Sequence, residues 1–80
     1  SLEADERIQM ADLSVDDHPS LLGKTLKNVG FKRDGMIVLG IKKANADFVF
    51  GPKSDYAFSE GDVLITLSTL EHYQEILEGI

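Results

Sequence analysis

Gly61-Asp62-Val63-Leu64-Ile65-Thr66-Leu67 is the stretch of this sequence that says most about its fold. The Gly-Asp pair predicts a tight turn, in which Gly61 has a positive φ and Asp62 bonds backbone amides of the same turn. In the run from Val63 to Ser68, the apolar residues Val63, Ile65 and Leu67 alternate with Leu64, Thr66 and Ser68. This two-residue period is the spacing of a strand. The stretch therefore predicts a turn followed by the last strand of a sheet.

A helix is expected directly after this strand. Ser68 or Thr69 can cap its first turn, and Ser68 with Glu71 three residues later fits a capping box. His72 falls on the exposed side of the predicted helix. The apolar stripe on its other side consists of Leu70, Tyr73, Ile76, Leu77 and Ile80.

Ser20-Leu21-Leu22-Gly23-Lys24-Thr25-Leu26 predicts a second, shorter helix in the first half of the chain. Leu22, Leu26 and Val29 are spaced as i, i+4 and i+7, so they share one helical face. Gly30 suits the left-handed residue that often ends a helix. We therefore expect a helix from about Lys24 to Val29.

The remaining apolar runs read as strands. Between Ala4 and Val15 the apolar positions change parity between Met10 and Leu13, which predicts a strand with a bulge or bend near Ala11-Asp12. Asp16-Asp17-His18-Pro19 ends this strand, and His18 is extended because it precedes proline.

A hairpin is expected in the middle of the chain. Gly35 supplies the positive φ of a turn before the apolar run Met36–Lys42. Regular alternation would place Ile37, Leu39 and Ile41 on one side of that strand and Met36 and Val38 on the other. After a loop at residues 43–47, Phe48 and Phe50 share one face of the returning strand.

This order predicts an α+β domain with a small, mainly antiparallel sheet of about four strands and two helices. The 80 residues suffice for a single domain over 1–80, in which we expect residues 1–5 to include a tag or linker and the whole to be a piece of a longer protein. The sequence has no cysteine, so it has no disulfide or thiolate metal site.

The charge of the chain argues against nucleic acid as a partner. Eight Lys and Arg residues face fourteen Asp and Glu residues, which gives a net charge of −6. A protein that binds the phosphate backbone would normally carry a basic stripe and a high isoelectric point. The basic residues at positions 24, 27, 32, 33, 42 and 43 form either one local positive face or scattered solvated side chains.

Taken in order, these motifs resemble the TrkA-C domain family, the C-terminal half of the RCK (regulator of potassium conductance) module. The family's Ser-x-Leu-x-Gly-Lys-Thr-Leu motif is matched, with one residue fewer, within Ser20–Leu26. Its Gly-Asp-x-Leu motif is matched by Gly61, Asp62 and Leu64, and its single proline after the third strand by Pro52.

The resemblance also covers the central strand, with two departures. Val38, Ile41 and Lys42 match the family pattern, and Gly40 stands where alanine is usual. The stretch between Val29 and Gly35 is one residue shorter than usual, so the family's arginine corresponds to Lys32 or Arg33. Ser68 stands where the last strand often ends in glycine.

The resemblance implies a regulatory, ligand-sensing domain of a potassium channel or potassium transport protein. Members form homodimers through this domain, and some bind cyclic dinucleotides, notably cyclic di-AMP, between the subunits. It further implies that the domain lies on the cytoplasmic side of the membrane, attached to the membrane part of its parent channel or transporter. The alternative is a dimerisation and assembly module of a membrane transporter that binds no small ligand.

Lys32 and Arg33 are the best candidates for holding an anion. Arginine presents a planar fork that suits phosphate, and the nearby Gly35 permits close approach. The alternative is a solvated turn. If a phosphate-bearing ligand binds there, we expect Ile37 and Pro52 to line its base side near a dimer axis.

Other candidate chemistry is weaker. Asp16, Asp17 and His18 are good metal ligands by type, but consecutive side chains on extended backbone point apart, which favours a structural turn. Gly23-Lys24-Thr25 lacks the earlier glycine of a phosphate loop. No nucleophile–base motif is visible, so we do not expect an enzyme.

The sheet is expected to leave apolar side chains exposed, because two small helices cannot cover both of its faces. We expect these to come from Met36, Val38, Phe48 or Phe50 and to form a homodimer contact. Phe48 and Phe50 can alternatively stack a nucleobase or belong to the core.

Overall fold

The computed structural model describes residues 6–80, so the expectation of a tag or linker at residues 1–5 lies outside the described residues. The sheet strands are β1 (Ile8–Ser14), β2 (Met36–Lys42), β3 (Phe48–Phe50) and β4 (Val63–Thr69). The helices are α1 (Leu26–Val29) and α2 (Leu70–Gly79), with two short 3-10 turns at Val15–Asp17 and Pro19–Leu21. The predicted α+β class and the order of strands and helices are confirmed.

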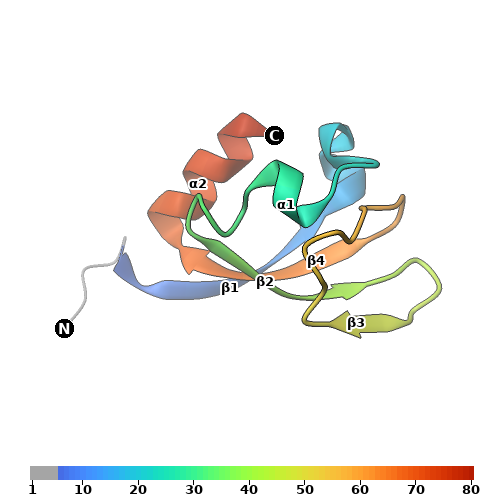
Figure 1. The fold of residues 1–80 in the computed structure, drawn as a ribbon. Helices are drawn as coiled ribbons and strands as arrows, with labels where there is room; N and C mark the ends of the chain where they lie inside the picture. The colour runs from blue at the N-terminus through green and yellow to red at the C-terminus, as the bar shows by residue number, and fades with distance from the viewer. Residues whose placement is uncertain (1–5) are drawn as a thin grey trace.

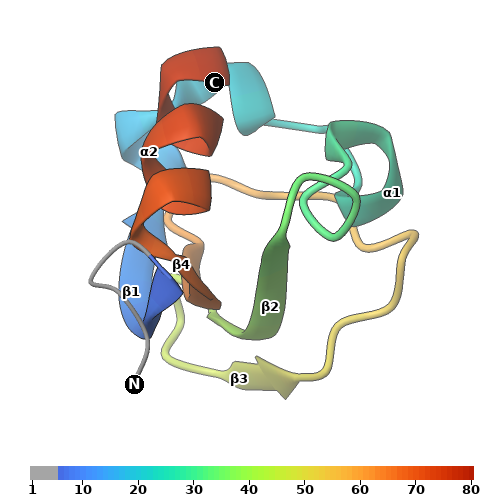
Figure 2. The same cartoon turned by 90° about the vertical axis from the view of Figure 1, so that its left-hand side faces the viewer.

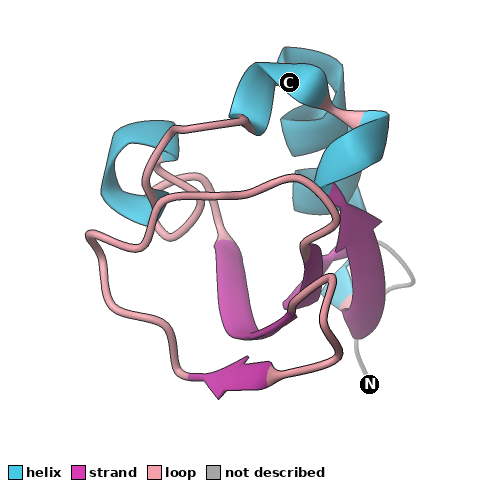
Figure 3. Cartoon of the chain, turned by 90° about the vertical axis from the view of Figure 1, so that its right-hand side faces the viewer, coloured by secondary structure: helices cyan, strands magenta, loops and turns pink. Residues whose placement is uncertain are grey.

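All strand pairs are antiparallel, and the sheet order is β1-β4-β2-β3. Both helices lie on the same side of this sheet, with α2 over β1 and β4 and α1 near the other half (Figures 1 and 2). A long loop connects β3 to β4 and passes beside α1, as Figure 3 shows. Within residues 6–80, none of the helices has the length and apolar character needed to cross a membrane.

The core fills the space between the sheet and the helices. It is anchored by Phe31 and Phe58, whose ring centroids lie 6.1 Å apart. The buried apolar side chains of this layer are Leu13, Val15, Leu21, Phe31, Met36, Ile41, Phe58, Leu64 and Ile76.

The bulge predicted in the first strand is wrong. β1 pairs with β4 without interruption, from Ile8 opposite Thr69 to Ser14 opposite Val63. The change of parity in the sequence arises because Met10 faces the solvent side of the sheet whereas Leu13 faces the core. Both faces of β1 carry apolar residues, so apolar positions alone do not define one face.

The bulge is instead in β2. Val38 pairs with Thr66 and Gly40 with Ile65, so Leu39 is an extra residue on the β2 side. An extra residue reverses the alternation beyond it. The predicted common side for Ile37, Leu39 and Ile41 is therefore wrong, because Ile37 is exposed while Ile41 is buried with Met36.

The helix ends follow the predicted chemistry with one correction. Thr25 caps α1, since its Oγ1 accepts a hydrogen bond of 3.2 Å from the Asn28 amide, and Gly30 ends the helix with φ +77°. Thr69 caps α2 through a 3.1 Å bond from the His72 amide. The expected capping box of Ser68 and Glu71 is wrong, because Ser68 is still part of β4.

The side of the sheet away from the helices carries exposed large apolar residues, between 55% and 79% exposed. We call this surface the open sheet face and define it by Ile8, Met10, Ile37, Phe48 and Phe50. The register confirms that they share one face, since Met10 and Ile37 both pair with Leu67. Phe48 and Phe50 were expected among the exposed residues, whereas Met36 was expected there and is buried.

Candidate ligand-binding site

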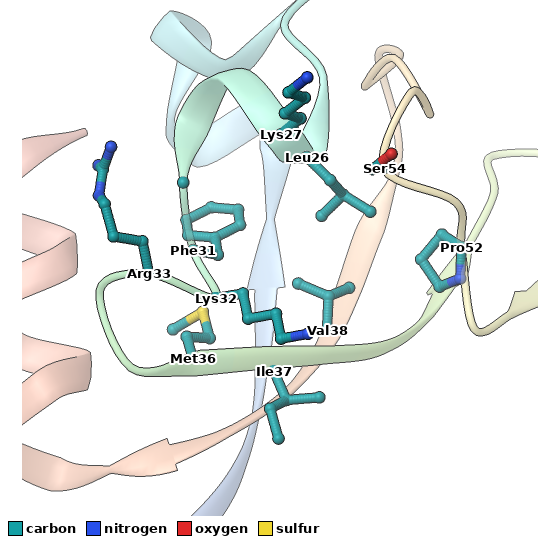
Figure 4. Close-up of a pocket in the computed structure, with 11 residues that line it drawn as sticks. Leu26, Lys27, Phe31, Lys32, Arg33, Met36, Ile37, Val38, Pro52 and Ser54 are labelled. Carbon is teal, nitrogen blue, oxygen red and sulfur yellow. The ribbon is translucent and has the colours of Figure 1, made fainter.

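A pocket of about 550 Å³ lies between α1, the turn that follows it, the start of β2 and the loop after β3. Its lining consists of Leu26, Lys27, Gly30, Phe31, Lys32, Arg33, Met36, Ile37, Val38, Pro52 and Ser54. All four residues that the sequence suggested for ligand binding, Lys32, Arg33, Ile37 and Pro52, belong to this lining, although the Ile37 side chain points to the other side of β2 (Figure 4).

The turn between α1 and β2 is held in place by its backbone. Gly30 and Gly35 both have positive φ, +77° and +96°, which allows the chain to leave the helix and re-enter the sheet within a few residues. The Met36 amide donates to the Phe31 carbonyl at 2.9 Å, and the Phe31 ring is buried. Lys32 and Arg33 therefore project from a closed, anchored turn.

The opposite wall is tied to α1 by main-chain hydrogen bonds. The Lys27 amide donates to the Ser54 carbonyl at 2.9 Å, and the Leu26 amide to the Tyr56 carbonyl at 3.2 Å. The Gly51 amide donates to the Leu39 carbonyl at 2.7 Å, which fixes the chain just before Pro52. These contacts place Pro52 and Ser54 across the pocket from the Lys32 turn.

The pocket is electropositive although the chain is acidic. Among residues 6–80, Lys27, Lys32 and Arg33 are in the lining, and no Asp or Glu is. The rest of the lining is apolar apart from Ser54 and Gly30. Such a site can take an anionic group beside a flat apolar group.

The two adjacent cations point in different directions. In Figure 4 the Lys32 side chain lies along β2 beside Val38, whereas Arg33 extends away from it past Phe31. The Arg33 guanidinium pairs with the Asp34 carboxylate at 2.9 Å. This pairing raises the pKa of Arg33 and lowers the pKa of Asp34, in each case chiefly through the hydrogen bond between them.

Sequence reasoning missed Lys27 and Ser54 as lining residues. In the sequence Lys27 is one of several basic residues with nothing that links it to a site, and Ser54 carries no signal. These two residues meet at the pocket only because α1 contacts the loop after β3 in the tertiary structure. Phe48 and Phe50 lie outside this lining, on the open sheet face.

The acidic stretch Asp16-Asp17-His18 has a structural role at its first residue. The Asp16 carboxylate accepts a hydrogen bond of 2.9 Å from the Gly61 amide, so it ties the end of β1 to the turn before β4. In the described part of the chain, residues 6–80, no group of three His, Cys, Asp or Glu side chains is placed to hold a metal ion.

Comparison with known proteins agrees with this architecture. The sequence model of the TrkA-C domain family matches residues 10–78. A search of the curated proteins found no match.

Two solved structures of the GsuK channel are similar in fold. The GsuK channel bound to NAD has a TM-score of 0.69 and 22% sequence identity, with 89% of this chain and 13% of that chain covered. A second GsuK channel structure has a TM-score of 0.69 and 20% identity, with 92% of this chain and 13% of that chain covered. This chain thus spans a small part of the length of those channels, and at these identities the likeness concerns the fold.

Proposed function

We propose that this chain, which belongs to the TrkA-C domain family, is the regulatory ligand-sensing domain of a potassium channel or potassium transport protein. TrkA-C domains are regulatory and not enzymatic. In this proposal the domain acts as a dimer that couples the binding of a small ligand to ion transport. It belongs on the cytoplasmic side of the membrane, joined to the membrane part of its parent protein.

The observation that carries the proposal is the charge of the pocket. A chain with a net charge of −6 repels anions at long range. Lys27, Lys32 and Arg33 nevertheless line one pocket whose lining has no carboxylate. A local cationic site on an acidic domain is what an anionic ligand requires.

The ligand that fits this lining best has phosphates and a flat base. Lys27, Lys32 and Arg33 supply charge-assisted donors for phosphate. Val38 and Pro52 supply apolar surface for a base, whereas the Ile37 side chain points to the other side of β2 (Figure 4). A cyclic dinucleotide such as cyclic di-AMP has both kinds of group, and NAD is the natural second candidate because the similar GsuK channel has been solved bound to NAD.

The open sheet face supports a homodimer. Five large apolar side chains are exposed there on a domain of 80 residues. The strand register adds only Asp12 and Lys42 as charged residues on this face, one of each sign. Two copies can therefore meet on this face with little charge repulsion, in a self-complementary two-fold contact.

Ile37 connects the two surfaces, because the residue is part of the pocket lining while its side chain points to the open sheet face (Figure 4). A ligand near Ile37 would therefore lie close to the partner subunit. This position would couple ligand binding to the geometry of the dimer. A pure assembly module, the alternative function, would use the open sheet face in the same way and leave the pocket empty.

Calorimetric titration of cyclic di-AMP and of NAD tests the proposal. The wild-type domain should bind one of them, and Lys32→Ala with Arg33→Ala should weaken binding at least about tenfold, because two charge-assisted contacts are lost. Lys24→Ala, an exposed cation outside the pocket lining, is the matched control and should leave affinity unchanged. Absence of heat with both ligands would favour the assembly module. If the double variant and the wild type bind with equal affinity, the ligand binds at a different site.

A further inference from the structure

Arg33 does not face the pocket freely, because both oxygens of Asp34 hold it. Arg33 Nε donates to Asp34 Oδ1 at 2.9 Å, and Arg33 Nη2 donates to Asp34 Oδ2 at 3.1 Å. This two-point contact uses the fork that a phosphate would need. An anion can gain the same two bonds from Arg33 only by displacing the Asp34 carboxylate.

The resting position of Arg33 also depends on Gly30. A Cβ atom at Gly30 would lie 2.6 Å from Arg33 Nη2 and 2.7 Å from Arg33 Cζ, so the guanidinium lies directly over the glycine. Gly30 lines the pocket. The guanidinium therefore rests at the rim, next to the pocket.

Arg33 separates two cavities of opposite electrostatic character. A second, smaller cavity of about 390 Å³ lies on its other side, between the Arg33 turn and α2. Its lining consists of Val29, Phe31, Arg33, Asp34, His72, Glu75, Ile76, Gly79 and Ile80. Asp34 and Glu75 make that side acidic, whereas the first pocket has no carboxylate in its lining.

We propose that Asp34 sets the affinity of the pocket for phosphate-bearing ligands, because its carboxylate competes with the ligand for the Arg33 guanidinium. This inference rests on the proposed function, since it concerns the same pocket. The ligands affected are anions with at least two phosphate groups, which can engage Lys27 and Lys32 and still offer oxygens to Arg33. A singly charged ligand that engages only Lys27 and Lys32 leaves the Arg33–Asp34 pair intact, so Asp34 does not change its affinity.

The competition is modest in size, because both side chains are exposed to solvent. The Arg33 and Asp34 side chains are 74% and 45% exposed. Exposed ion pairs change an equilibrium constant by roughly fivefold at most. The resting contact therefore lowers affinity without blocking the pocket.

Calorimetric titration of cyclic di-AMP into four proteins tests this role: wild type, Asp34→Asn, Arg33→Gln and the double variant. Asp34→Asn should tighten binding by about three- to fivefold in the wild-type background, because Arg33 is released. In the Arg33→Gln background the same change should alter affinity less than about twofold, which is the screened effect of removing one charge. Asp55→Asn, another exposed carboxylate close to Ser54, controls for net charge and should also change affinity less than about twofold.

An NMR measurement, made first without ligand and then with cyclic di-AMP, separates this inference from the proposed function. The Nε–H resonance of Arg33 in a nitrogen–proton NMR spectrum should shift and exchange faster with solvent in Asp34→Asn, and it should shift in the wild type when cyclic di-AMP is added. If the wild type binds ligand but Asp34→Asn binds no more tightly, the role of Asp34 is wrong and the pocket assignment stands. If neither wild type nor Asp34→Asn binds cyclic di-AMP or NAD, both proposals are overturned.

Discussion

The phenol of Tyr56 donates a hydrogen bond of 2.8 Å to the carboxylate of Asp62, a residue that is only 1% exposed. The same carboxylate oxygen accepts from the Ser59 amide at 2.9 Å. Lys43 approaches from the β2–β3 loop, with its Nζ 2.6 Å from the Tyr56 hydroxyl and 3.5 Å from Asp62. A buried carboxylate thus joins the hairpin loop to the segment that leads into β4.

Tyr56→Phe should destabilise the domain by about 1–3 kcal/mol, because the buried Asp62 carboxylate loses a donor that nothing replaces. The phenyl ring would keep its edge contact with Phe58, whose centroid lies 6.1 Å away. Urea denaturation measures the change. Tyr73→Phe, in a half-buried ring on α2, is the matched control; if the two variants unfold at the same urea concentration, the hydrogen bond to Asp62 contributes nothing.

The stability of the domain should fall at alkaline pH through this same group of residues. The hydrogen bond to Tyr56 raises the pKa of Lys43 from its ordinary value of 10.5, and burial raises the pKa of Tyr56 from 10.0. The folded state therefore holds both protons more tightly than the unfolded chain. Their contribution is fully present below the ordinary values and is lost as the pH rises through the raised ones.

Thermal unfolding between about pH 9 and about pH 11 measures this dependence. Wild type should lose more of its midpoint temperature over this range than Tyr56→Phe, which lacks the titrating phenol and the bond that raises the pKa of Lys43. Parallel curves for the two proteins would contradict the assignment.

Gly61→Ala should destabilise the domain by more than about 1 kcal/mol. Gly61 has φ +82°, and a Cβ there would lie 2.6 Å from the Cβ of Ala44, so the substitution is both strained and crowded. Gly51→Ala separates the two effects, because Gly51 also has positive φ but open space around it. Gly79→Ala, which has neither constraint and lies in α2, should be neutral or slightly stabilising in urea denaturation; a Gly61→Ala variant as stable as wild type would refute the turn.

Ala46→Gly should stabilise the domain by about 0.5–1 kcal/mol, because Ala46 has φ +72° in the β2–β3 loop, a conformation that glycine adopts without strain. Denaturant unfolding measures the gain. Ala44→Gly in the same loop is the control, since its φ is not positive, and it should bring no gain. Loss of stability in Ala46→Gly would mean that the loop tolerates the left-handed residue at no cost.

The open sheet face should control association. Met10→Lys and Phe50→Lys each place a charge in the proposed contact and should weaken the dimer at least about tenfold. Leu22→Lys is the matched control, since Leu22 is also an exposed apolar residue but lies off this face.

Sedimentation equilibrium at about 100 μM, where a dimer with a Kd of about 10 μM is mostly associated, measures the change. A wild-type monomer at that concentration would overturn the dimer. If both charged variants still dimerise like the wild type, the dimer contact lies on another face of the domain.

Local sequence patterns predicted the elements well where one signal dominates. The alternation from Val63 onward and the helix stop at Gly30 are both present in the structure. Gly35 and Gly61 have the positive φ that their turns require, and the Asp62 carboxylate bonds the Ser59 amide of its turn. Such features depend on a few neighbouring residues, so the sequence contains the whole cause.

The faces of the strands were harder to predict, because both sides of the sheet carry apolar residues. Leu39 bulges out of β2 and reverses the side on which Ile41 lies. Met10 is apolar and exposed, so the apolar positions of β1 change parity as they would at a bulge, although β1 has none. Apolar periodicity identifies a buried face only when the other face is polar.

The class, the order of the elements and four residues that line one pocket were thus predictable from the sequence. The packing of the sheet against the helices brought Lys27 and Ser54 to this pocket and placed Arg33 against Asp34. It also decided that Tyr56, Lys43 and Asp62 meet. Turns and helix ends are short-range and are specified by neighbouring residues, whereas these contacts join segments whose distance is fixed only when the sheet and helices pack together.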